Sequence, residues 1–244
     1  MSPPNAQALY PAIEATWPTA AITRAGPWAI RDGKGGGKRV SAATAEAAFD
    51  ATDLATAEAA MRALGQPPLF WIREGEDALD TLLAQAQYDI IDPVTLYVAD
   101  TAPIAAHRPP PVSTFLMPEP LAIMREIWAT GGIGPARIQV MDRACAPKTT
   151  ILGRTADRPV GTGFAAIHQG TAMVHALEVL PTARRQGMAR HMMHALAGWA
   201  QAHGAPHLAL AVTQANAPAN ALYRSLGMQV AGRYHYRIKK GDTP

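Results

Sequence analysis

The sequence predicts a layered α+β (α/β) fold, and three observations support this class. Segments of strand character alternate with segments of helical periodicity along the chain, as in layered α/β and α+β architectures. Apolar residues make up 48% of the 244 residues, which is enough for a sizeable core. No run of about 18 apolar residues occurs, so neither a membrane-spanning helix nor a membrane partner is expected.

In the first half, "WAIRDGKGGGKRVSAAT" is predicted to form a strand, a glycine turn and a second strand. A helix over 52–65 follows, with Thr52 or Asp53 as its cap and Gly65 as its terminator. The remaining predicted elements are a strand over 68–75, a helix over 77–88 and a strand over 94–100.

A proline-rich segment marks the expected domain boundary. Residues 105–120, "AAHRPPPVSTFLMPEP", hold five prolines, which resist helix interiors and cannot donate backbone hydrogen bonds. Net charge changes sign at the same place. We therefore expect one domain over residues 1–109 and a second over residues 110–244.

The second half is predicted to be richer in strands. A helix over 120–132 is stopped by paired glycines, and four strands then follow, over 136–142, 148–154, 160–170 and 171–180. The later elements are a helix over 188–202, a strand over 207–214, a helix over 217–227 and a strand over 228–240. In the first of these helices, one stripe at helical spacing is predicted to be core: Met188, Met192, Ala195, Leu196 and Trp199.

Charge is distributed unevenly between the two halves. Residues 1–109 contain 8 Lys and Arg against 13 Asp and Glu, whereas residues 110–244 contain 14 against 6. A basic half indicates an anionic partner, either a nucleic acid or a phosphorylated cofactor, and a basic face without a ligand is the alternative. Because aromatic residues are only 6% and no interleaved basic-aromatic patch occurs, no nucleic-acid partner is expected.

Cysteine and histidine usage limits the possible metal chemistry. The single cysteine, Cys145, allows no intrachain disulfide and no cysteine-cluster metal site. His191 and His194 share a helix face, but no carboxylate lies near them in the sequence. We expect no metal. Because "MSPPNAQALYPAIEATW" lacks the features of a secretory signal, we expect a cytoplasmic protein.

The segment "VLPTARRQGMAR" has the composition of an anion-binding turn. A strand ending at Leu180 leads into a helix that begins near Gly187. The first turn of a helix leaves backbone N–H groups without internal partners and carries partial positive charge, and Gly187 permits close approach of a ligand. Arg184 and Arg185 add to the field. On spacing alone, a solvated basic turn is an equal alternative.

Two motifs in this half occur in a fixed order. Residues 184–189, Arg-Arg-Gln-Gly-Met-Ala, match the pattern Gln or Arg, two residues, Gly, one residue, Gly or Ala. After one helix and one strand, the pattern Asn-x-x-Ala-x-x-Leu-Tyr-x-x-x-Gly is matched by Asn216, Ala219, Leu222, Tyr223 and Gly227. In both motifs and in their order, residues 110–244 resemble the GNAT superfamily of N-acetyltransferases. The resemblance implies a central mixed, mostly antiparallel sheet flanked by helices.

The resemblance also implies that acetyl-CoA is bound as cosubstrate. The amides from Arg185 to Arg190 would bind the pyrophosphate, the strand at Leu177 and Val179 would pair with the pantetheine amides, and Asn216 would bind the pantetheine arm. The implied cofactor-binding residues are Leu177, Val179, Arg184, Arg185, Gln186, Gly187, Met188, Ala189, Arg190, Asn216, Asn220 and Tyr223.

For catalysis, the resemblance implies that Tyr223 protonates the departing thiolate, with packing against the cofactor as the alternative role. A backbone N–H near Val179 would polarise the thioester carbonyl. Glu178, His175 and His168 are the candidates for the general base, and a water chain is the alternative. Strand alternation puts His175 on the face of Leu177 and Val179, with Glu178 on the other, unless a bulge changes this parity.

The glycine-rich stretch "DGKGGGKR" resembles a phosphate-binding loop only superficially. Gly37-Lys38 lacks the glycine five positions earlier, and Arg39 follows instead of Ser or Thr. We interpret it as a hairpin turn.

Residues 1–109 carry neither motif. Their element order is similar to a degenerate GNAT-like half, which would pack on the second half and form a wall of the acceptor pocket. The acidic balance of this half would suit a cationic acceptor.

The sequence therefore predicts an N-acetyltransferase that transfers acetyl directly to a primary amine of a small molecule or peptide. The alternative is a non-catalytic acyl-CoA-binding sensor. Either a monomer or a homodimer fits these features.

Overall fold

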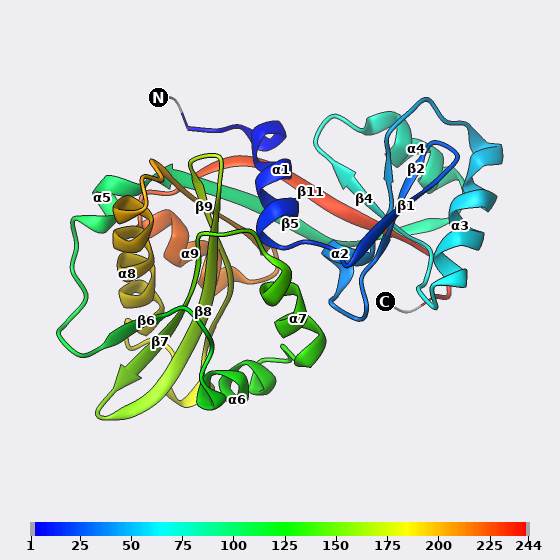
Figure 1. Ribbon diagram of the computed structural model, residues 1–244. Helices are drawn as coiled ribbons and strands as arrows, with labels where there is room; N and C mark the ends of the chain where they lie inside the picture. The colour runs from blue at the N-terminus through cyan, green and yellow to red at the C-terminus, as the bar shows by residue number, and fades with distance from the viewer. Residues whose placement is uncertain (1–2, 243–244) are drawn as a thin grey trace.

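The computed structural model describes residues 3–242 and shows a mixed α+β fold built on one large sheet (Figure 1). The strands are β1 (Ala21–Ala25), β2 (Trp28–Asp32), β3 (Thr44–Ala45), β4 (Leu69–Arg73), β5 (Tyr88–Asp100), β6 (Thr114–Met117), β7 (Lys148–Thr155), β8 (Arg158–His168), β9 (Thr171–Val179), β10 (His207–Thr213) and β11 (Gln229–Lys239). The helices are α1 (Ala6–Thr16), α2 (Lys38–Ser41), α3 (Leu54–Ala63), α4 (Asp77–Gln85), α5 (Thr101–Ala105), α6 (Ala122–Thr130), α7 (Pro135–Arg143), α8 (Met188–Ala202) and α9 (Ala217–Ser225), with 3-10 turns η1 (Ala51–Asp53) and η2 (Pro181–Ala183).

The large sheet has the order β4-β11-β5-β10-β9-β8-β7-β6. Neighbouring strands run antiparallel except β10 and β9, which run parallel. The predicted mixed, mostly antiparallel sheet flanked by helices is therefore confirmed.

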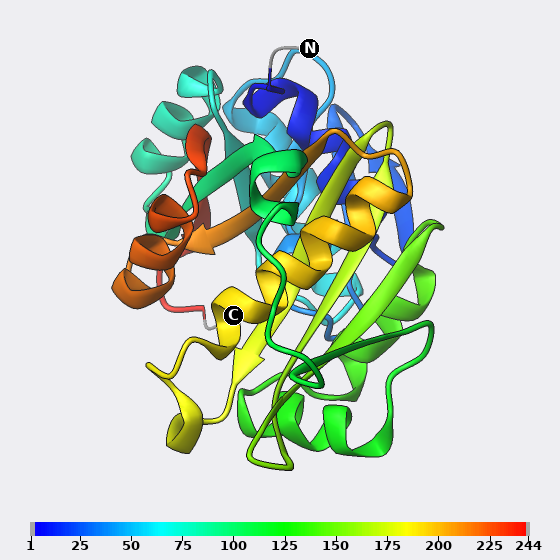
Figure 2. The same ribbon diagram turned by 90° about the vertical axis from the view of Figure 1, so that its left-hand side faces the viewer.

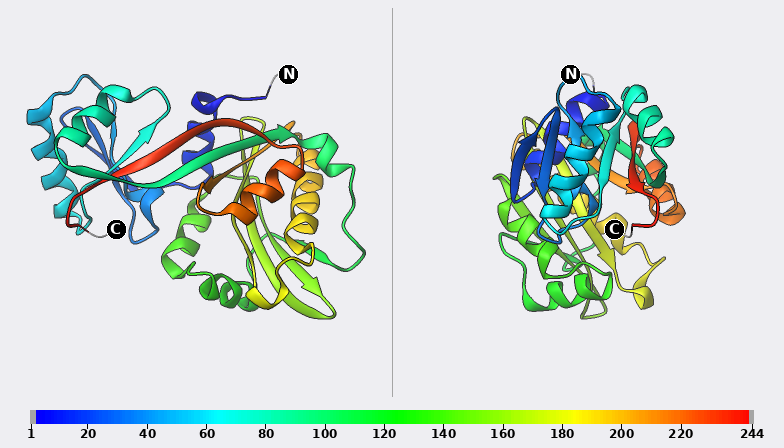
Figure 3. Two further views of the ribbon diagram at one scale, coloured as in Figure 1. Left: turned by 180° about the vertical axis from the view of Figure 1, so that it is seen from behind. Right: turned by 90° about the vertical axis from the view of Figure 1, so that its right-hand side faces the viewer.

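Strands β5 and β11 extend from the large sheet into a smaller lobe, as Figure 3 shows. There β4 pairs with β11, and a second sheet, β1-β2-β3, adjoins β4 through the bridge between Ala43 and Phe70. Helices α3 and α4 cover this lobe around a core that includes Trp28 and Tyr88. Because β5 pairs with both β10 and β11, one sheet crosses residue 110, and the division into two domains stays a prediction.

The two faces of the large sheet are covered by different helices. Helix α8 lies across one face (Figure 2), and α1, α6 and α7 lie on the other. The predicted core stripe of α8 is confirmed at four positions, where Met188, Met192, Leu196 and Trp199 are buried, while Ala195 is only half-buried. This packing fixes the start of α8 against the end of β9.

The prediction of a strand over 136–142 is wrong, because this segment forms helix α7. The apolar and polar residues alternate locally, which favoured a strand. However, Gly134 and Pro135 begin a helix whose fixed proline φ suits its first turn. Ile138 and Met141, three residues apart, are buried on the side that faces the sheet.

The predicted hairpin over 28–44 is also wrong in its second strand. The first strand is β2, but Lys38–Ser41 form the short helix α2, and β3 contains only Thr44 and Ala45. Gly36 allows this turn to pack closely, because a Cβ there would lie 2.6 Å from Val140 Cγ2 of α7. The glycine run therefore brings α2 against the large sheet's helical layer.

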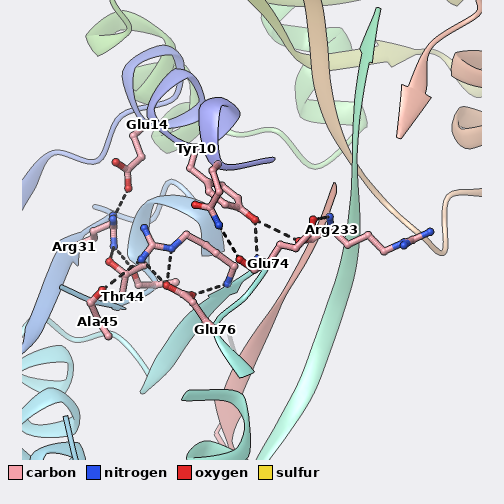
Figure 4. A network of polar contacts seen from close by, with 11 residues as sticks. Tyr10, Glu14, Arg31, Thr44, Ala45, Glu74, Glu76 and Arg233 are labelled. Carbon is pink, nitrogen blue, oxygen red and sulfur yellow. Dashed lines mark hydrogen bonds and ion pairs between the residues drawn. The ribbon is translucent and has the colours of Figure 1, made fainter. Parts of the chain in front are cut away.

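A polar network joins α1 to the smaller lobe, as Figure 4 shows. Arg31 forms an ion pair with Glu14 of α1 and donates to the carbonyl of Ala42 (3.0 Å) and to Thr44 Oγ1 (2.9 Å). At the other end of the helix, Tyr10 Oη accepts from the amide of Glu74 at 2.8 Å. These contacts fix α1, whose C-terminal end reaches the site described next.

Candidate active site

The central feature of the site is an opening in the sheet between β9 and β10. The two strands pair from Thr171 and His207 as far as Val174 and Leu210, and then diverge, although both continue further. A cavity of about 400 Å³ follows this opening and is lined by both strands, by α9, and, from the opposite face, by α2, α7 and Trp17, the residue after α1. Within residues 3–242, no strand pairs with the edge of β9 that faces β10 beyond Val174, and on this edge the Val179 carbonyl accepts from the side chain of Arg184. An unpaired strand edge can bind a ligand that carries amide groups.

A β-bulge in β9 decides which side chains face the opening. The register steps from Thr162 opposite Glu178 to Phe164 opposite His175, and Ala176 has a φ of +50°. Leu177 and Val179 consequently pack with the α8 core, whereas His175 packs beside Trp17 on the opposite face. Glu178 also lies on that opposite face, against Gly131 at the end of α6. The parity expected from simple alternation is therefore wrong, because the bulge adds one residue.

The turn between β9 and α8 has the geometry of an anion-binding site. Arg185 and Gly187 both have positive φ, of +65° and +87°, and Gly187 is the N-cap of α8. Within residues 3–242, the amides of Arg185, Gln186 and Gly187 make no hydrogen bond, and the first turn of α8 adds further free amides. This turn can therefore bind a phosphate group through its backbone.

The arginines of this turn have separate contacts. Arg184 folds back onto β9, where its Nε donates to the Val179 carbonyl at 2.9 Å and its Nη2 lies 3.0 Å from Glu178 Oε1. Arg190 Nη2 donates to Ser225 Oγ at 2.7 Å, and Arg185 is exposed. Within residues 3–242, the side chain of Arg185 has no hydrogen-bond or ion-pair partner and can meet a ligand.

Helix α9 brings the second motif to the cavity. Asn216 lines the cavity and caps the helix by accepting from the amide of Ala219 at 3.1 Å. Asn220 is buried behind it: its Oδ1 accepts from Tyr97 Oη (3.1 Å), and its Nδ2 donates to the carbonyls of Thr213 (3.0 Å) and Asn216 (2.8 Å). The side chain of Asn220 is therefore occupied in joining α9 to β10.

Tyr223 lines the same cavity, one turn further along α9. The side chain is buried, and within residues 3–242 its hydroxyl makes no hydrogen bond. Burial raises the pKa of Tyr223 above that of an ordinary tyrosine. The hydroxyl thus keeps its proton at neutral pH and can donate it inside the cavity.

His175 also lines the cavity, but both of its ring nitrogens have partners. Thr16 Oγ1 donates to the carbonyl of Ala12 at 2.6 Å, so at 2.9 Å it accepts from Nε2 of His175. This leaves Nδ1 as the acceptor, and Arg39 Nη1 lies 3.2 Å from it. Burial, reinforced by the charge of Arg39, holds the pKa of His175 well below its usual range. His175 is therefore a neutral imidazole that accepts from Arg39.

The two other candidate bases lie outside the cavity lining. Glu178 is paired with Arg184, and its carboxylate occupies the space beside Gly131, where a Cβ would lie 2.7 Å from the carboxyl group. His168 is half-buried at the end of β8, next to the hairpin that leads to β9. Of the three predicted bases, the fold brings only His175 together with Tyr223.

Several cavity residues were not predicted from the sequence. Lys38 and Arg39 come from α2, Arg137 comes from α7, and Tyr234 and Tyr236 come from β11. A partial signal existed, because the glycine run before Lys38 and the alternating tyrosines of the last strand both stand out. Neither signal shows that these segments, almost 200 residues apart at the extremes, meet at one cavity.

Comparisons with known proteins agree with this geometry. Residues 121–228 match the acetyltransferase (GNAT) family. A GCN5-related N-acetyltransferase from Kribbella flavida superposes with a TM-score of 0.72 at 18% identity, over 98% of this chain and 96% of that one. A functionally unknown conserved protein from Staphylococcus epidermidis ATCC 12228 has a TM-score of 0.68 at 12% identity, over 95% and 97%.

A tandem GNAT protein from the clavulanic acid biosynthesis pathway is similar over 80% of this chain and 69% of its own, with 12% identity and a TM-score of 0.54. No curated protein matches the chain in sequence. Within residues 3–242, no helix combines the length and apolarity needed to cross a bilayer, and no group of three or more His, Cys, Asp or Glu could hold a metal ion.

Residues 121–228 therefore match a GNAT acetyltransferase domain, and the chain has the GNAT fold, as the motifs at residues 184–189 and 216–227 predict. This match supports acyl transfer as the general chemistry of the domain.

Proposed function

We propose that this protein is an N-acetyltransferase that transfers an acetyl group from acetyl-CoA directly to a primary amine. The observation that carries the proposal is the opening between β9 and β10, which has a protonated phenol, Tyr223, in its wall. Pantetheine carries peptide-like donors and acceptors, and an unpaired strand edge can bind these as it would bind another strand.

The residues around the opening fit acetyl-CoA. The edge of β9 at Leu177 and the amide of Val179 suit the pantetheine amides, while the Val179 carbonyl is held by Arg184; the amides around Gly187, without partners within residues 3–242, suit the pyrophosphate. Asn216 can donate to the pantetheine arm, because its cap bond uses only Oδ1. Asn220 would act indirectly, by holding α9 and the end of β10 in place.

Acetyl-CoA supplies the acetyl group as a thioester: the amine nitrogen bonds to the acetyl carbon, the C–S bond breaks, and the sulfur takes a proton. Tyr223 can give that proton, because its hydroxyl is protonated, lines the cavity from α9 and has no competing partner within residues 3–242. An amide of β9 near Val179 can polarise the carbonyl.

The proton of the incoming amine is proposed to leave through water. His175 has a depressed pKa and donates through Nε2 while its Nδ1 accepts from Arg39, so it is poorly suited to take a proton. Glu178 is paired with Arg184 outside the cavity lining. We assign His175 to positioning Arg39, and Glu178 to fixing the turn before α8.

We also propose that residues 1–109 contribute to the acceptor side of the site, together with α7 and β11. Trp17 after α1 and the segment Gly36 to Arg39 line the cavity opposite α9. The support is that this half contributes side chains, whereas the coenzyme side consists mainly of backbone groups.

The proposal is tested by measuring free coenzyme A released from acetyl-CoA in the presence of a panel of primary amines. Turnover that depends on an amine and yields its N-acetyl product supports the enzyme. Tight binding of acetyl-CoA by calorimetry, with no turnover on any amine, would instead support the non-catalytic sensor. Failure of acetyl-CoA to bind at saturating concentration would contradict both.

A further inference from the structure

The acceptor side of the cavity is cationic, although the N-terminal half as a whole is acidic. Its charged lining residues are Lys38, Arg39 and Arg137 against one carboxylate, Asp92. Asp92 is paired with Lys38 at 2.9 Å. Within residues 3–242, neither Arg39 nor Arg137 forms an ion pair with a carboxylate. Two positive charges at this end of the cavity are therefore not neutralised by these residues.

Arg39 is held in place by a neutral partner. A chain of hydrogen bonds leads from Arg39 to His175, from His175 to Thr16, and from Thr16 to the Ala12 carbonyl. Because the imidazole accepts from Nη1 without supplying negative charge, the guanidinium keeps its full charge. Its Nε is buried without any partner within residues 3–242. A buried unpaired donor is costly, so this guanidinium is arranged to meet an acceptor group.

Arg137 approaches the same place from α7. A Cβ at Gly37 would lie 3.3 Å from both Nε and Nη2 of Arg137, so the guanidinium packs directly against the backbone of this glycine. Gly37 also has a φ of +97°, which side chains rarely adopt. The glycine run thus permits the two arginines, from α2 and α7, to line one wall.

The remaining polar groups of this wall are also donors. The hydroxyl of Tyr234 is buried without a partner within residues 3–242. Burial raises the pKa of Tyr236, so its hydroxyl remains protonated. Together with Trp17, these rings line the wall beside the two arginines, and the wall offers N–H and O–H groups.

We infer that the acceptor is a primary amine that also carries an anionic group, a carboxylate or a phosphate, and that Arg39 and Arg137 bind this group. The inference rests on the proposed function and names the substrate class of the same site. Guanidinium groups match the planar carboxylate and the phosphate as bidentate partners. A polyamine would instead place further positive charge beside two unneutralised arginines, which is unfavourable.

The first experiment compares matched pairs of amines that differ by the anionic group. Suitable pairs are L-phenylalanine with 2-phenylethylamine, 4-aminobutyrate with butylamine, and O-phosphoethanolamine with ethanolamine, with spermidine as the polyamine. We expect kcat/KM for the anionic member of at least one pair to exceed that of its partner by roughly 10- to 100-fold, as for charged hydrogen bonds at a binding site. The two amino acids test a carboxylate and O-phosphoethanolamine tests a phosphate, so the pairs distinguish the two kinds of anionic group.

The second experiment uses Arg39→Gln and Arg137→Gln, with Arg24→Gln as the matched control. Arg24 is an exposed arginine paired with Glu46 outside the cavity. Each cavity variant should raise KM for the anionic amine about tenfold or more and so reduce the preference for it over the neutral partner, whereas the control should leave this preference intact. Coenzyme A binding and thermal unfolding of each variant verify that it is folded. If Arg39→Gln does not fold, the comparison of Arg137→Gln with the control is sufficient to test the inference.

A binding measurement makes the inference independent of turnover. Calorimetric titration of the protein saturated with coenzyme A should detect the anionic amine, and each cavity variant should weaken this binding about tenfold or more. Acetylation of neutral amines or spermidine in preference to the anionic ones would overturn the inference and leave the proposed function intact. An anionic preference that survives both variants would overturn the assignment to these arginines.

Two further outcomes separate the inference from the function. If no amine is acetylated although acetyl-CoA binds, the proposed function fails, and arginine-dependent binding of an anionic amine still supports the anion site. If no anionic amine either binds or reacts, the inference is overturned.

Discussion

The two walls of the cavity are built on different physical principles. The proposed coenzyme wall is the edge of β9 that borders the cavity, and the turn around Gly187 continues it beyond the cavity lining; both offer mainly backbone groups. The proposed acceptor wall offers side chains, from Trp17 after α1 and from α2, α7 and β11, held by contacts between distant segments. A backbone wall can bind a constant ligand with little dependence on side chains, whereas a side-chain wall sets which acceptor enters.

The largest effect is expected for Tyr223, which we propose to act in the chemical step itself. Tyr223→Phe should lower kcat by roughly 10²- to 10⁴-fold, the usual contribution of a general acid, with little change in acetyl-CoA binding. Steady-state kinetics and calorimetry measure the two quantities. Tyr88→Phe is the matched control: Tyr88 is buried in the smaller lobe, donates to Glu58 at 2.8 Å and lies outside the cavity lining. Unchanged kcat in the Tyr223 variant would show that the phenol only packs.

The coenzyme wall is tested alone by Gly187→Ala. The residue has a φ of +87°, and a side chain in this left-handed region costs about 1–2 kcal/mol, or relaxes the turn that exposes the amides. The dissociation constant of coenzyme A should therefore rise about 5- to 30-fold, by calorimetric titration. KM for the acceptor should stay the same, and a change in acceptor KM alone would contradict the separation of the two walls. Gly198→Ala in the middle of α8, where a Cβ meets open space, is the control.

His175, in the proposed acceptor wall, is expected to make the free energy of unfolding depend on pH. Its folded pKa is depressed by burial and by Arg39, whereas in the unfolded chain it titrates near pH 6.5. Below about pH 6.5 the unfolded chain takes up a proton that the native site resists. The free energy of unfolding should therefore fall by up to about 1.4 kcal/mol per pH unit until the folded pKa is reached.

This contribution is absent in His175→Gln. Urea unfolding at pH 7.5, 6.5 and 5.5 should show the stability difference between native and variant protein shrinking as the pH falls. Parallel curves would contradict the assignment of a buried, neutral His175.

The smallest effect is expected for Glu178→Gln. An ion pair in which Arg184 is more than half exposed contributes about 0–1 kcal/mol to stability, and the carboxylate lies outside the cavity lining. We expect kcat/KM to change by less than about threefold, similar to Glu126→Gln on the exposed side of α6. A loss of about 100-fold or more would restore Glu178 as the general base.

The sequence predicted the elements of the proposed coenzyme side better than those of the acceptor side. The motifs at 184–189 and 216–227 lie in short segments, so local pattern was sufficient to place the turn before α8 and helix α9. By contrast, helix α1 was not anticipated, and residues 136–142 were predicted to be a strand. Both elements border the acceptor side, where Trp17 and Arg137 contribute. Their roles depend on long-range packing, which local periodicity does not encode.

The bulge at Ala176 shows the same limit within a single strand. Simple alternation predicted that His175 and Leu177 share one face of β9. The extra residue of the bulge instead puts His175 on the opposite face, beside Thr16. A bulge is a mismatch between two paired strands, so the sequence of one strand does not reveal it.

By itself, the sequence determined the α+β class, the order of elements from residue 148 onward and the glycine-containing turn before α8, because periodicity, glycine φ and helix ends act locally. Only the tertiary structure decided that α2, α7 and β11 meet β9 at one cavity and that His175 is held between Thr16 and Arg39. These features depend on which distant segments pack together to bury apolar surface and satisfy buried polar groups, and that is a property of the whole chain.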